Sequence, residues 1–312
     1  MKRTIALGLS ILFIVLSLVA CNNKVPDTQT NQIATETKDT SSMTPEELDS
    51  DSAEVHTSNQ NSCIFDFDTQ VVYESDQASI TALKFEQVGD QTALNLKFKN
   101  LTDKDVIFSS ENGIIVINGL TMSVSIYVNL AAGKTSTEKM FIDSETLRLY
   151  GINKINSLSF NLEMLEEDSY NRVALLKDIV IKAKDYEEDF KQKFDSGSED
   201  NILYDDKGIK LTYIGKDAVK EYNSSIDCLV FSVENTDPEA QVSIFANEAY
   251  LDDNKIEMYN QSTVNYPPNS KGYMILYGYN DKTINTLKGH IEIKMTLDHN
   301  SDNDTISFDK TL

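Results

Sequence analysis

The chain has 312 residues, of which 40% are hydrophobic, and its formal net charge at pH 7 is −22. This length accommodates two ordinary domains, and the hydrophobic content supports packed cores, so general disorder is excluded. A field this negative repels nucleic acids and anionic lipid headgroups, so neither is expected as a direct ligand. Solvated, repulsive surface is the simplest explanation of the acidity, although such a surface also attracts cations and basic partners.

Residues 1–20 have the pattern of a secretory signal. The basic pair Lys2-Arg3 precedes an almost unbroken apolar run from Ile5 to Ala20, and a small-residue cleavage site follows. The run ends in Leu18-Val19-Ala20-Cys21, which resembles the lipobox of bacterial lipoproteins. The resemblance implies a mature chain that begins at Cys21, carries diacylglycerol on its sulfur and is anchored to the outer face of the cell membrane. A plain secretory signal and an uncleaved membrane helix are the alternatives.

Residues 21–62 are rich in Thr, Ser, Asn, Gln, Asp and Glu, with no aromatic residue and no apolar period. Such a segment cannot bury enough surface to offset its chain entropy, so the sequence predicts a disordered stalk. A flexible chain of about 40 residues has a mean end-to-end distance on the order of 35 Å. This length suits a spacer between a membrane and the folded domains.

An internal repeat occupies the remainder of the chain. Val71–Leu83 matches Ile202–Ile214, and the strand-like stretch Leu94–Asn100 matches Leu229–Asn235. Each of the latter two stretches is followed by Thr-Asp, and further matches follow in the same order with an offset of about 131 to 135 residues. Matches that keep one order favour a duplicated domain.

The apolar period within each copy is two. Leu94, Leu96 and Phe98 alternate with polar residues, which predicts half-buried strands with one solvated face. Seven or eight such strands in about 110 residues are typical of an immunoglobulin-like β-sandwich, and a closed barrel fits almost as well. Turn signals separate the strands, among them Asn112-Gly113, Asn118-Gly119, Asp206-Lys207-Gly208 and Pro267-Pro268-Asn269.

The sequence therefore predicts an all-β chain with two tandem immunoglobulin-like β-sandwich domains, residues 63–184 and residues 201–312. The linker, residues 185–200, contains the highly charged stretch Asp185–Phe194, for which we predict a helical segment. A second, short helical turn is predicted at Ser144–Tyr150, immediately before Gly151.

The chain resembles the uncharacterised two-domain, immunoglobulin-like lipoproteins of low-GC Gram-positive bacteria. The lipobox, the polar stalk and the strand ends at Asn100 and Asn235, each followed by Thr-Asp, carry this resemblance. It implies a lipid-anchored extracellular protein and specifies no chemistry. Asn100 and Asn235 are expected to cap strand-to-loop turns, because Asn tolerates the left-handed region and hydrogen-bonds its own backbone.

One acidic string imitates a calcium loop. Asp298, Asn300, Asp302 and Asp304 place oxygen-bearing side chains at alternate positions, with Asp309 at the twelfth. The glycine of such loops is replaced by Asn303, the final Glu is Asp, and the residues before Asp309 alternate as a strand. An acidic hairpin between the last two strands is therefore the preferred interpretation, and a weak calcium site is the alternative. No cofactor is expected.

Few other residues suggest a specific chemical function. Cys63 and Cys228 are permitted to form a disulfide outside the cell if their Cα atoms come within roughly 7 Å, but two thiols are the default expectation. We predict a non-enzymatic binding or scaffold module for a protein, glycan or cell-wall partner. The alternative is a carboxylate-based hydrolase of cell-envelope polysaccharide, for which acidic pairs such as Asp205-Asp206 are available. A binding face in the second domain is suggested by its tyrosines, Tyr222, Tyr250, Tyr259, Tyr266, Tyr273, Tyr277 and Tyr279.

Overall fold

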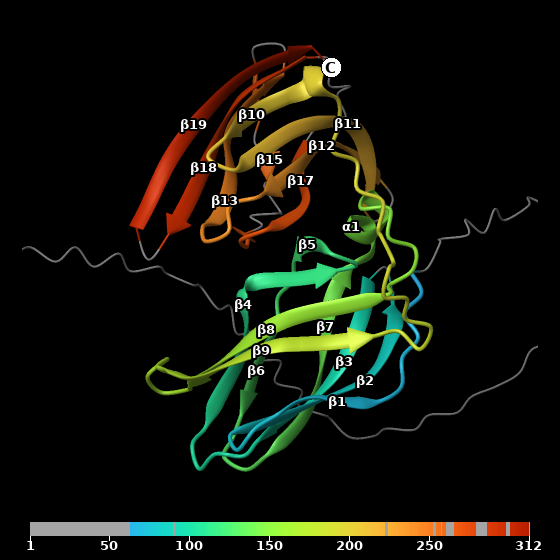
Figure 1. Cartoon of the computed structure of the whole chain (residues 1–312), viewed down its shortest axis with the longest axis vertical. Helices are drawn as coiled ribbons and strands as arrows, with labels where there is room; N and C mark the ends of the chain where they lie inside the picture. The colour runs from blue at the N-terminus through green and yellow to red at the C-terminus, as the bar shows by residue number, and fades with distance from the viewer. Residues whose placement is uncertain are drawn as a thin grey trace, which may run out of the picture. The chain divides into compact units, whose positions relative to one another are not determined.

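The computed structural model describes residues 63–89, 91–221, 224–251, 254–256, 258–259, 265–278, 286–297 and 300–311. Contacts group Ser58–Leu312 as one unit, and Figure 1 labels many of its strands. Residues 1–62 lie outside the described part, so the signal sequence, the lipid at Cys21 and the stalk stay predictions. No helix among the described residues is long and apolar enough to cross a membrane.

The all-β prediction is confirmed for the described residues. One short α-helix, α1 (Ser144–Leu149), and one 3-10 turn, η1 (Glu199–Asn201), interrupt the strands. The strands before residue 185 are β1 (Gln70–Glu74), β2 (Ala78–Val88), β3 (Gln91–Asn100), β4 (Val106–Ile117), β5 (Leu120–Ser123), β6 (Tyr127–Leu130), β7 (Thr135–Asp143), β8 (Ser157–Glu166) and β9 (Arg172–Lys182). Those after it are β10 (Ile202–Asp206), β11 (Ile209–Glu221), β12 (Ser224–Asn235), β13 (Gln241–Leu251), β14 (Asn254–Ile256), β15 (Met258–Tyr259), β16 (Asn265–Tyr266), β17 (Ser270–Gly278), β18 (Thr286–Leu297) and β19 (Asn300–Thr311).

These strands form three sheets. The first has the order β1-β2-β3-β7, and the third has the order β14-β13-β18-β19 with β16 paired to β13. The second sheet runs β10-β11-β12-β17-β5-β4-β8-β9, with β15 paired to β17 and β6 paired to β4. It therefore contains strands of both sequence repeats, which meet where Gly272 of β17 pairs in parallel with Thr121 of β5.

The first repeat is built as two sheets packed face to face. Leu94, Leu96 and Phe98 are fully buried, as their spacing of two predicts, and they share one hydrophobic cluster with side chains of β4 and β8. The rings of Phe98 and Phe108, which belong to different sheets, have centroids 5.2 Å apart. Two separate sheets with a common core are a sandwich, not a closed barrel.

Irregularities of strand pairing recur in the second repeat. The register of β1 against β2 shifts between Val71 and Tyr73, and that of β10 against β11 shifts between Ile202 and Tyr204. The next hairpin behaves alike, with a shift after Ala82 in β2 and another after Tyr213 in β11. The shift in the β10–β11 pair lies 131 residues after the shift in the β1–β2 pair (Val71 to Ile202). The shift in the β11–β12 pair likewise lies 131 residues after the shift in the β2–β3 pair (Ala82 to Tyr213).

Asn100 makes a buried side-chain network at the end of β3. Its Nδ2 donates to the carbonyl oxygens of Lys104 at 2.7 Å, Leu130 at 3.1 Å and Ala131 at 3.2 Å. Its Oδ1 accepts the N–H of Thr102 at 2.9 Å. The amide thus caps the strand-to-loop turn, as predicted, and also holds the distant segment that leads into β7.

Asn235 repeats this network at the end of β12. Its Nδ2 donates to the carbonyl oxygens of Ala240 at 2.8 Å, Tyr266 at 3.1 Å and Pro267 at 2.8 Å, and its Oδ1 accepts the N–H of Asp237 at 3.0 Å. Neither asparagine has a positive φ, so the left-handed conformation is not the reason for this residue type. The hydrogen bonds of the side-chain amide explain this residue type.

One predicted turn is instead a bulge inside a strand. Asn112 and Gly113 have φ of 54° and 66°, and β4 continues through them while its register against β8 shifts between Ser110 and Ile115. The two left-handed residues bend β4, so that its first part pairs with β6 and its second part with β5. The other signals, Asn118-Gly119 and Asp206-Lys207-Gly208, are turns with positive φ, as predicted.

The predicted helix at Asp185–Phe194 is wrong. Residues 185–198 contain no helix and form turns and irregular backbone. The backbone of Glu187 donates to Asn156 Oδ1 and accepts from Asn156 Nδ2, both at 2.9 Å. The ring of Phe194 lies 5.1 Å from that of Tyr273. These contacts with distant residues stabilise a non-helical conformation of the segment, whereas a helix would satisfy its backbone hydrogen bonds internally.

The short helix is confirmed. Asp143 is the N-cap of α1, since its carboxylate accepts the N–H groups of Glu145 at 3.3 Å and Thr146 at 3.0 Å. The helix ends before Gly151, whose φ is 65°. A left-handed glycine after the last turn is a common helix terminator.

We expect Asn100→Ala to lower the free energy of unfolding by about 2–3 kcal/mol, because it removes the amide that donates to the buried carbonyl oxygen of Leu130 and to those of Lys104 and Ala131. Urea denaturation of the full chain measures this loss. Asn129→Ala is the matched control, since Asn129 is exposed on β6. Equal stability of the two variants would contradict the role of the amide.

Candidate functional site

The residues of the predicted calcium loop lie along a strand. Asn300, Asp302 and Asp304 occupy alternate positions of β19, paired with residues of β18, whereas Asp298 lies outside the described residues. Alternate Cα atoms of a strand are about 6.7 Å apart, whereas a calcium loop wraps around its ion. The backbone at these three positions is that of the preferred interpretation, the acidic hairpin. Among the described residues, no group of three or more His, Cys, Asp or Glu residues is placed to hold a metal ion.

Cys63 and Cys228 are not joined by a disulfide. Cys228 is fully buried in the core. Cys63 is partly exposed, and burial raises the pKa of its thiol to about 12. It lines a surface cavity of about 360 Å³, and the other lining residues are Ile64, Phe65, Asp66, Phe85, Glu86 and Gln87.

We expect the Cys63 thiol of the folded protein to react with iodoacetamide at pH 8 at least about a hundredfold more slowly than the same thiol in urea. Its pKa rises from 9.0 to about 12 on folding, and only the thiolate is nucleophilic. Peptide mapping by mass spectrometry measures the labelling at this residue. Equal rates in the folded and unfolded chain would show that the thiol is not held in its neutral form.

Two exposed tyrosines lie near each other on the first repeat. Tyr127 and Tyr170, here called the aromatic patch, are 57% and 63% exposed. Tyr127 begins β6. Phe141 of β7 is also exposed, but its neighbours Met140 and Ile142 belong to the core, so it points to the outer face of the other sheet. The pKa of Tyr127 is raised, first by desolvation and then by the neighbouring Tyr170.

The outer face of β4, beside the patch, contains a buried side chain. Val106 and Phe108 of β4 belong to the sandwich core, so Ile107 between them points to the outer face. Ile107 pairs with Asn129 of β6 and Leu165 of β8 and is nevertheless fully buried. Side chains on the neighbouring strands therefore cover the outer face of β4 beside the patch.

Tyr170 has an unusual backbone conformation. It lies in the turn between β8 and β9 with φ of 56°, and its N–H donates to the carbonyl oxygen of Glu166 at 2.9 Å. Glycine is the residue that such a left-handed position favours, and a bulky side chain there costs roughly 1–2 kcal/mol. Backbone strain at an exposed aromatic residue is a feature of recognition sites.

Two ion pairs lie beside the patch. Arg172 forms an ion pair with Glu163, and Lys104 forms one with Glu166. The ammonium of Lys104 lowers the pKa of Glu166, with help from the hydroxyl of Ser169, which donates to that carboxylate at 2.8 Å. The rim of the patch is therefore polar, and Glu167, whose charge also raises the pKa of Tyr127, adds negative charge to it.

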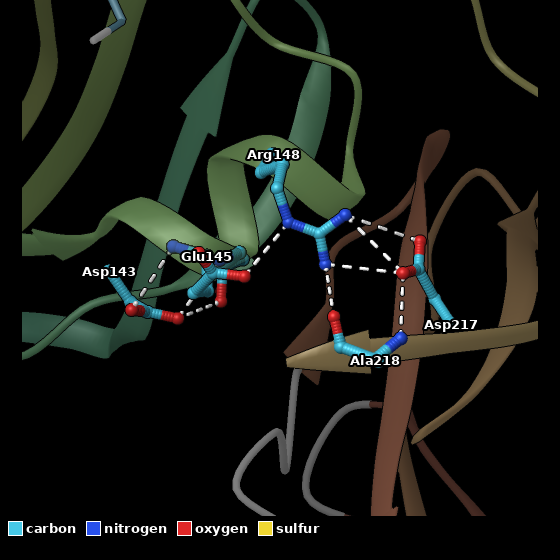
Figure 2. Close-up of polar contacts among 6 residues, drawn as sticks. Asp143, Glu145, Arg148, Asp217 and Ala218 are labelled. Atoms are coloured by element: carbon cyan, nitrogen blue, oxygen red, sulfur yellow. Dashed lines mark hydrogen bonds and ion pairs between the residues drawn. The ribbon is translucent and has the colours of Figure 1, made fainter. Parts of the chain in front are cut away.

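A polar network joins the two repeats at α1 (Figure 2). Arg148 bonds to the carboxylate of Glu145 at 2.8 Å, to that of Asp217 in β11 at 3.3 Å, and to the carbonyl oxygen of Ala218 at 2.6 Å. Figure 2 shows the guanidinium between the helix and β11. These groups are partly exposed, so each ion pair contributes modestly to stability.

Beside this network lies a buried contact through Tyr150. Its hydroxyl lies 2.7 Å from the carbonyl oxygen of Tyr273 and 3.2 Å from that of Thr121, and it accepts the N–H of Tyr273 at 3.2 Å. At the adjacent Gly272, a Cβ atom would lie 2.3 Å from the carbonyl oxygen of Thr121. Glycine is therefore required for β17 to approach β5, and we name this contact the junction.

We expect Tyr150→Phe to lower the free energy of unfolding by about 1–2 kcal/mol, since buried backbone groups of Tyr273 lose their hydroxyl partner. Urea denaturation measures the change. Tyr186→Phe, which removes the hydroxyl of a tyrosine at the surface, is the control. Identical curves for the two variants would mean that the hydroxyl does not support the junction.

The tyrosines expected to form a binding face in the second repeat do not gather at the surface where they are described. Tyr266 and Tyr273 are buried, and the side chains of the other five lie outside the described residues. The exposed pair Tyr127 and Tyr170 lies in the first repeat, where the tyrosine count does not point to a binding face. One signal was available: Tyr170 follows the polar run Glu167-Asp168-Ser169 in a hairpin turn, where glycine is common.

Comparison with known proteins identifies no family. No family model and no curated protein matches the chain. Among solved structures, the chain is similar to the Salmonella enterica SafA pilin in complex with the SafB chaperone, with 10% identity over 76% of this chain and 98% of that chain and a TM-score of 0.21. A likeness with this TM-score carries no argument about fold or function.

Proposed function

We propose that this protein is a membrane-anchored extracellular lipoprotein that acts as a non-enzymatic binding or scaffold module for a protein, glycan or cell-wall partner. The aromatic patch carries the proposal. Tyrosine supplies large contact area with a polar end and is enriched at recognition surfaces. Tyr170 also keeps a strained backbone at an exposed turn, which is unfavourable for stability alone.

The proposed organisation is two immunoglobulin-like copies of one domain on a lipid-tethered stalk. The recurring register shifts and the matching networks of Asn100 and Asn235 support duplication. The lipobox ending at Cys21 and the polar residues 21–62 support the tether. In this arrangement the stalk carries the aromatic patch away from the membrane toward envelope components.

Crosslinking on intact cells tests this function. We expect the wild-type protein to capture a specific envelope component, and the double variant Tyr127→Ala/Tyr170→Gly to lose it. Tyr186→Ala is the matched control, because it removes an exposed tyrosine elsewhere. We expect Cys21→Ser to abolish membrane retention, which separates neighbours captured through the anchor from those captured through the patch.

Two outcomes would contradict the proposal. One is an identical set of crosslinked neighbours for the wild-type protein and the double variant. The other is turnover of labelled envelope polysaccharide that a single Asp or Glu substitution abolishes, which would establish the hydrolase instead.

A further inference from the structure

The outer face of the first sheet carries a regular set of lysines and hydroxyl groups, here called the lysine face. Leu96 and Phe98 of β3 belong to the core, so the exposed residues Lys97 and Lys99 that alternate with them point outward. Strand pairing aligns three rows across β2, β3 and β7, which are Ser79–Lys99–Thr135, Thr81–Lys97–Thr137 and Lys84–Asn95–Lys139. Lys97 and Lys99 therefore each have a hydroxyl residue as neighbour on both sides.

The two lysines of the third row are neutralised within the chain. Lys84 and Lys139 both form ion pairs with the carboxylate of Glu86, that of Lys139 at 3.0 Å. Lys97 and Lys99 differ, because no carboxylate of the described residues lies within ion-pair distance of either ammonium group. The first two rows therefore present two charges that remain available to a ligand.

Unpaired lysines on one face are notable in so acidic a chain. Asp and Glu number 50 against 28 Lys and Arg, and Lys104, Lys154 and Lys184 of the same repeat each have a carboxylate partner. The face thus concentrates positive charge where the composition alone predicts the opposite.

The nearest acidic residue on the strands beside these rows is at the margin of the sheet. Glu74 of β1 is exposed and pairs with Ser79, so its backbone lies two strands from Lys99, roughly 9.6 Å away at about 4.8 Å per strand. Salt screens charges over about 8 Å at physiological ionic strength. An anion that lies along β3 is therefore attracted by Lys97 and Lys99 more strongly than it is repelled by Glu74.

The spacing of the two lysines describes the ligand. Alternate residues of a strand are about 6.7 Å apart, so a ligand that contacts both ammonium groups extends along β3 and carries repeated anionic groups. A phosphate offers several acceptor oxygens, which accept from an ammonium group and from the hydroxyl group beside it. A row of lysine and hydroxyl groups therefore suits a chain of phosphodiesters.

Other linear or extended anions fit the face less well. The nine residues of the three rows include no aromatic side chain, whereas sugar rings and nucleic-acid bases pack on aromatic rings. A peptide that adds to a sheet needs a free strand edge, but β3 is paired on both sides. An anionic membrane is a plane, so it would also approach the acidic remainder of a chain whose net charge is −22.

We propose that the lysine face binds a linear polyol-phosphate polymer, which lies along β3 and contacts Lys97 and Lys99. The hydroxyl groups of the first two rows donate to the phosphate oxygens between these contacts. This inference goes beyond the proposed function, because it assigns a second surface that does not involve the aromatic patch.

Calorimetric titration of the full chain, made soluble by Cys21→Ser, with synthetic poly(glycerol phosphate) tests this inference. Each phosphate contact contributes about 0.7 to the dependence of log affinity on log salt concentration, so two contacts predict about sevenfold weaker binding when the salt concentration is raised fourfold. We expect Lys97→Gln/Lys99→Gln to bind at least about fivefold more weakly and to lose most of this salt dependence. Both residues are exposed, so the urea midpoint is expected to stay unchanged.

Lys191→Gln/Lys193→Gln is the matched control, because it removes two exposed lysines with the same spacing in sequence outside the lysine face. We expect this variant to bind like the wild-type protein, and Lys97→Arg/Lys99→Arg to retain binding because it keeps both charges. Absence of binding, or equal weakening by the two Gln double variants, would overturn the inference.

Two further probes distinguish the source of the anion. Polygalacturonate carries carboxylates on sugar rings, and vesicles of phosphatidylglycerol and phosphatidylcholine present phosphodiesters on a plane. We expect both to bind more weakly than poly(glycerol phosphate), and equal or tighter binding of either would refute the polyol-phosphate ligand. The variant Tyr127→Ala/Tyr170→Gly is expected to bind the polymer normally, so failure of this inference is distinguishable from failure of the proposed function.

Discussion

The buried amide of Asn100 determines how the first sheet is assembled. Its side chain holds the carbonyl oxygens of Leu130 and Ala131, and its backbone N–H donates to the carbonyl oxygen of Lys134 at 2.9 Å. β7 begins at the next residue, and Lys99 pairs with Thr135. The amide thus sets the register of β7 on β3, and a shift of one residue would turn every core side chain of β7 outward.

The junction depends on the same register. Asp143 ends β7 and caps α1, so the strand determines where the helix begins. The helix in turn carries Arg148 to β11 and is followed by Tyr150, which contacts the backbone of β17. A local network at the end of one strand therefore reaches the second repeat through a chain of rigid elements, and Gly272 allows the backbones to meet.

Local patterns predicted much of this fold. Alternation predicted the strands, turn residues such as Asn118-Gly119 predicted hairpins, and the repeated asparagine with Thr-Asp close behind it predicted matching strand ends. The pattern failed at Asn112-Gly113, because two left-handed residues suit both a hairpin turn and a bulge, and the choice depends on which strands pair with β4. It failed at Asp185–Phe194, because Asn156 and Tyr273, which are distant in sequence, fix that segment.

The aromatic patch was less predictable than the fold for a related reason. A count of tyrosines indicates the second repeat, but burial depends on strand register and places Tyr266 and Tyr273 in the interior. The exposed pair, Tyr127 and Tyr170, comes from segments more than 40 residues apart in sequence, and Tyr170 opposes the local preference for glycine. Tyr170 shares its positive φ with Asp178 and Lys207, which also stand where glycine is favoured. The side chain that a strained turn presents to solvent therefore becomes evident only when its backbone conformation and its exposure are known together.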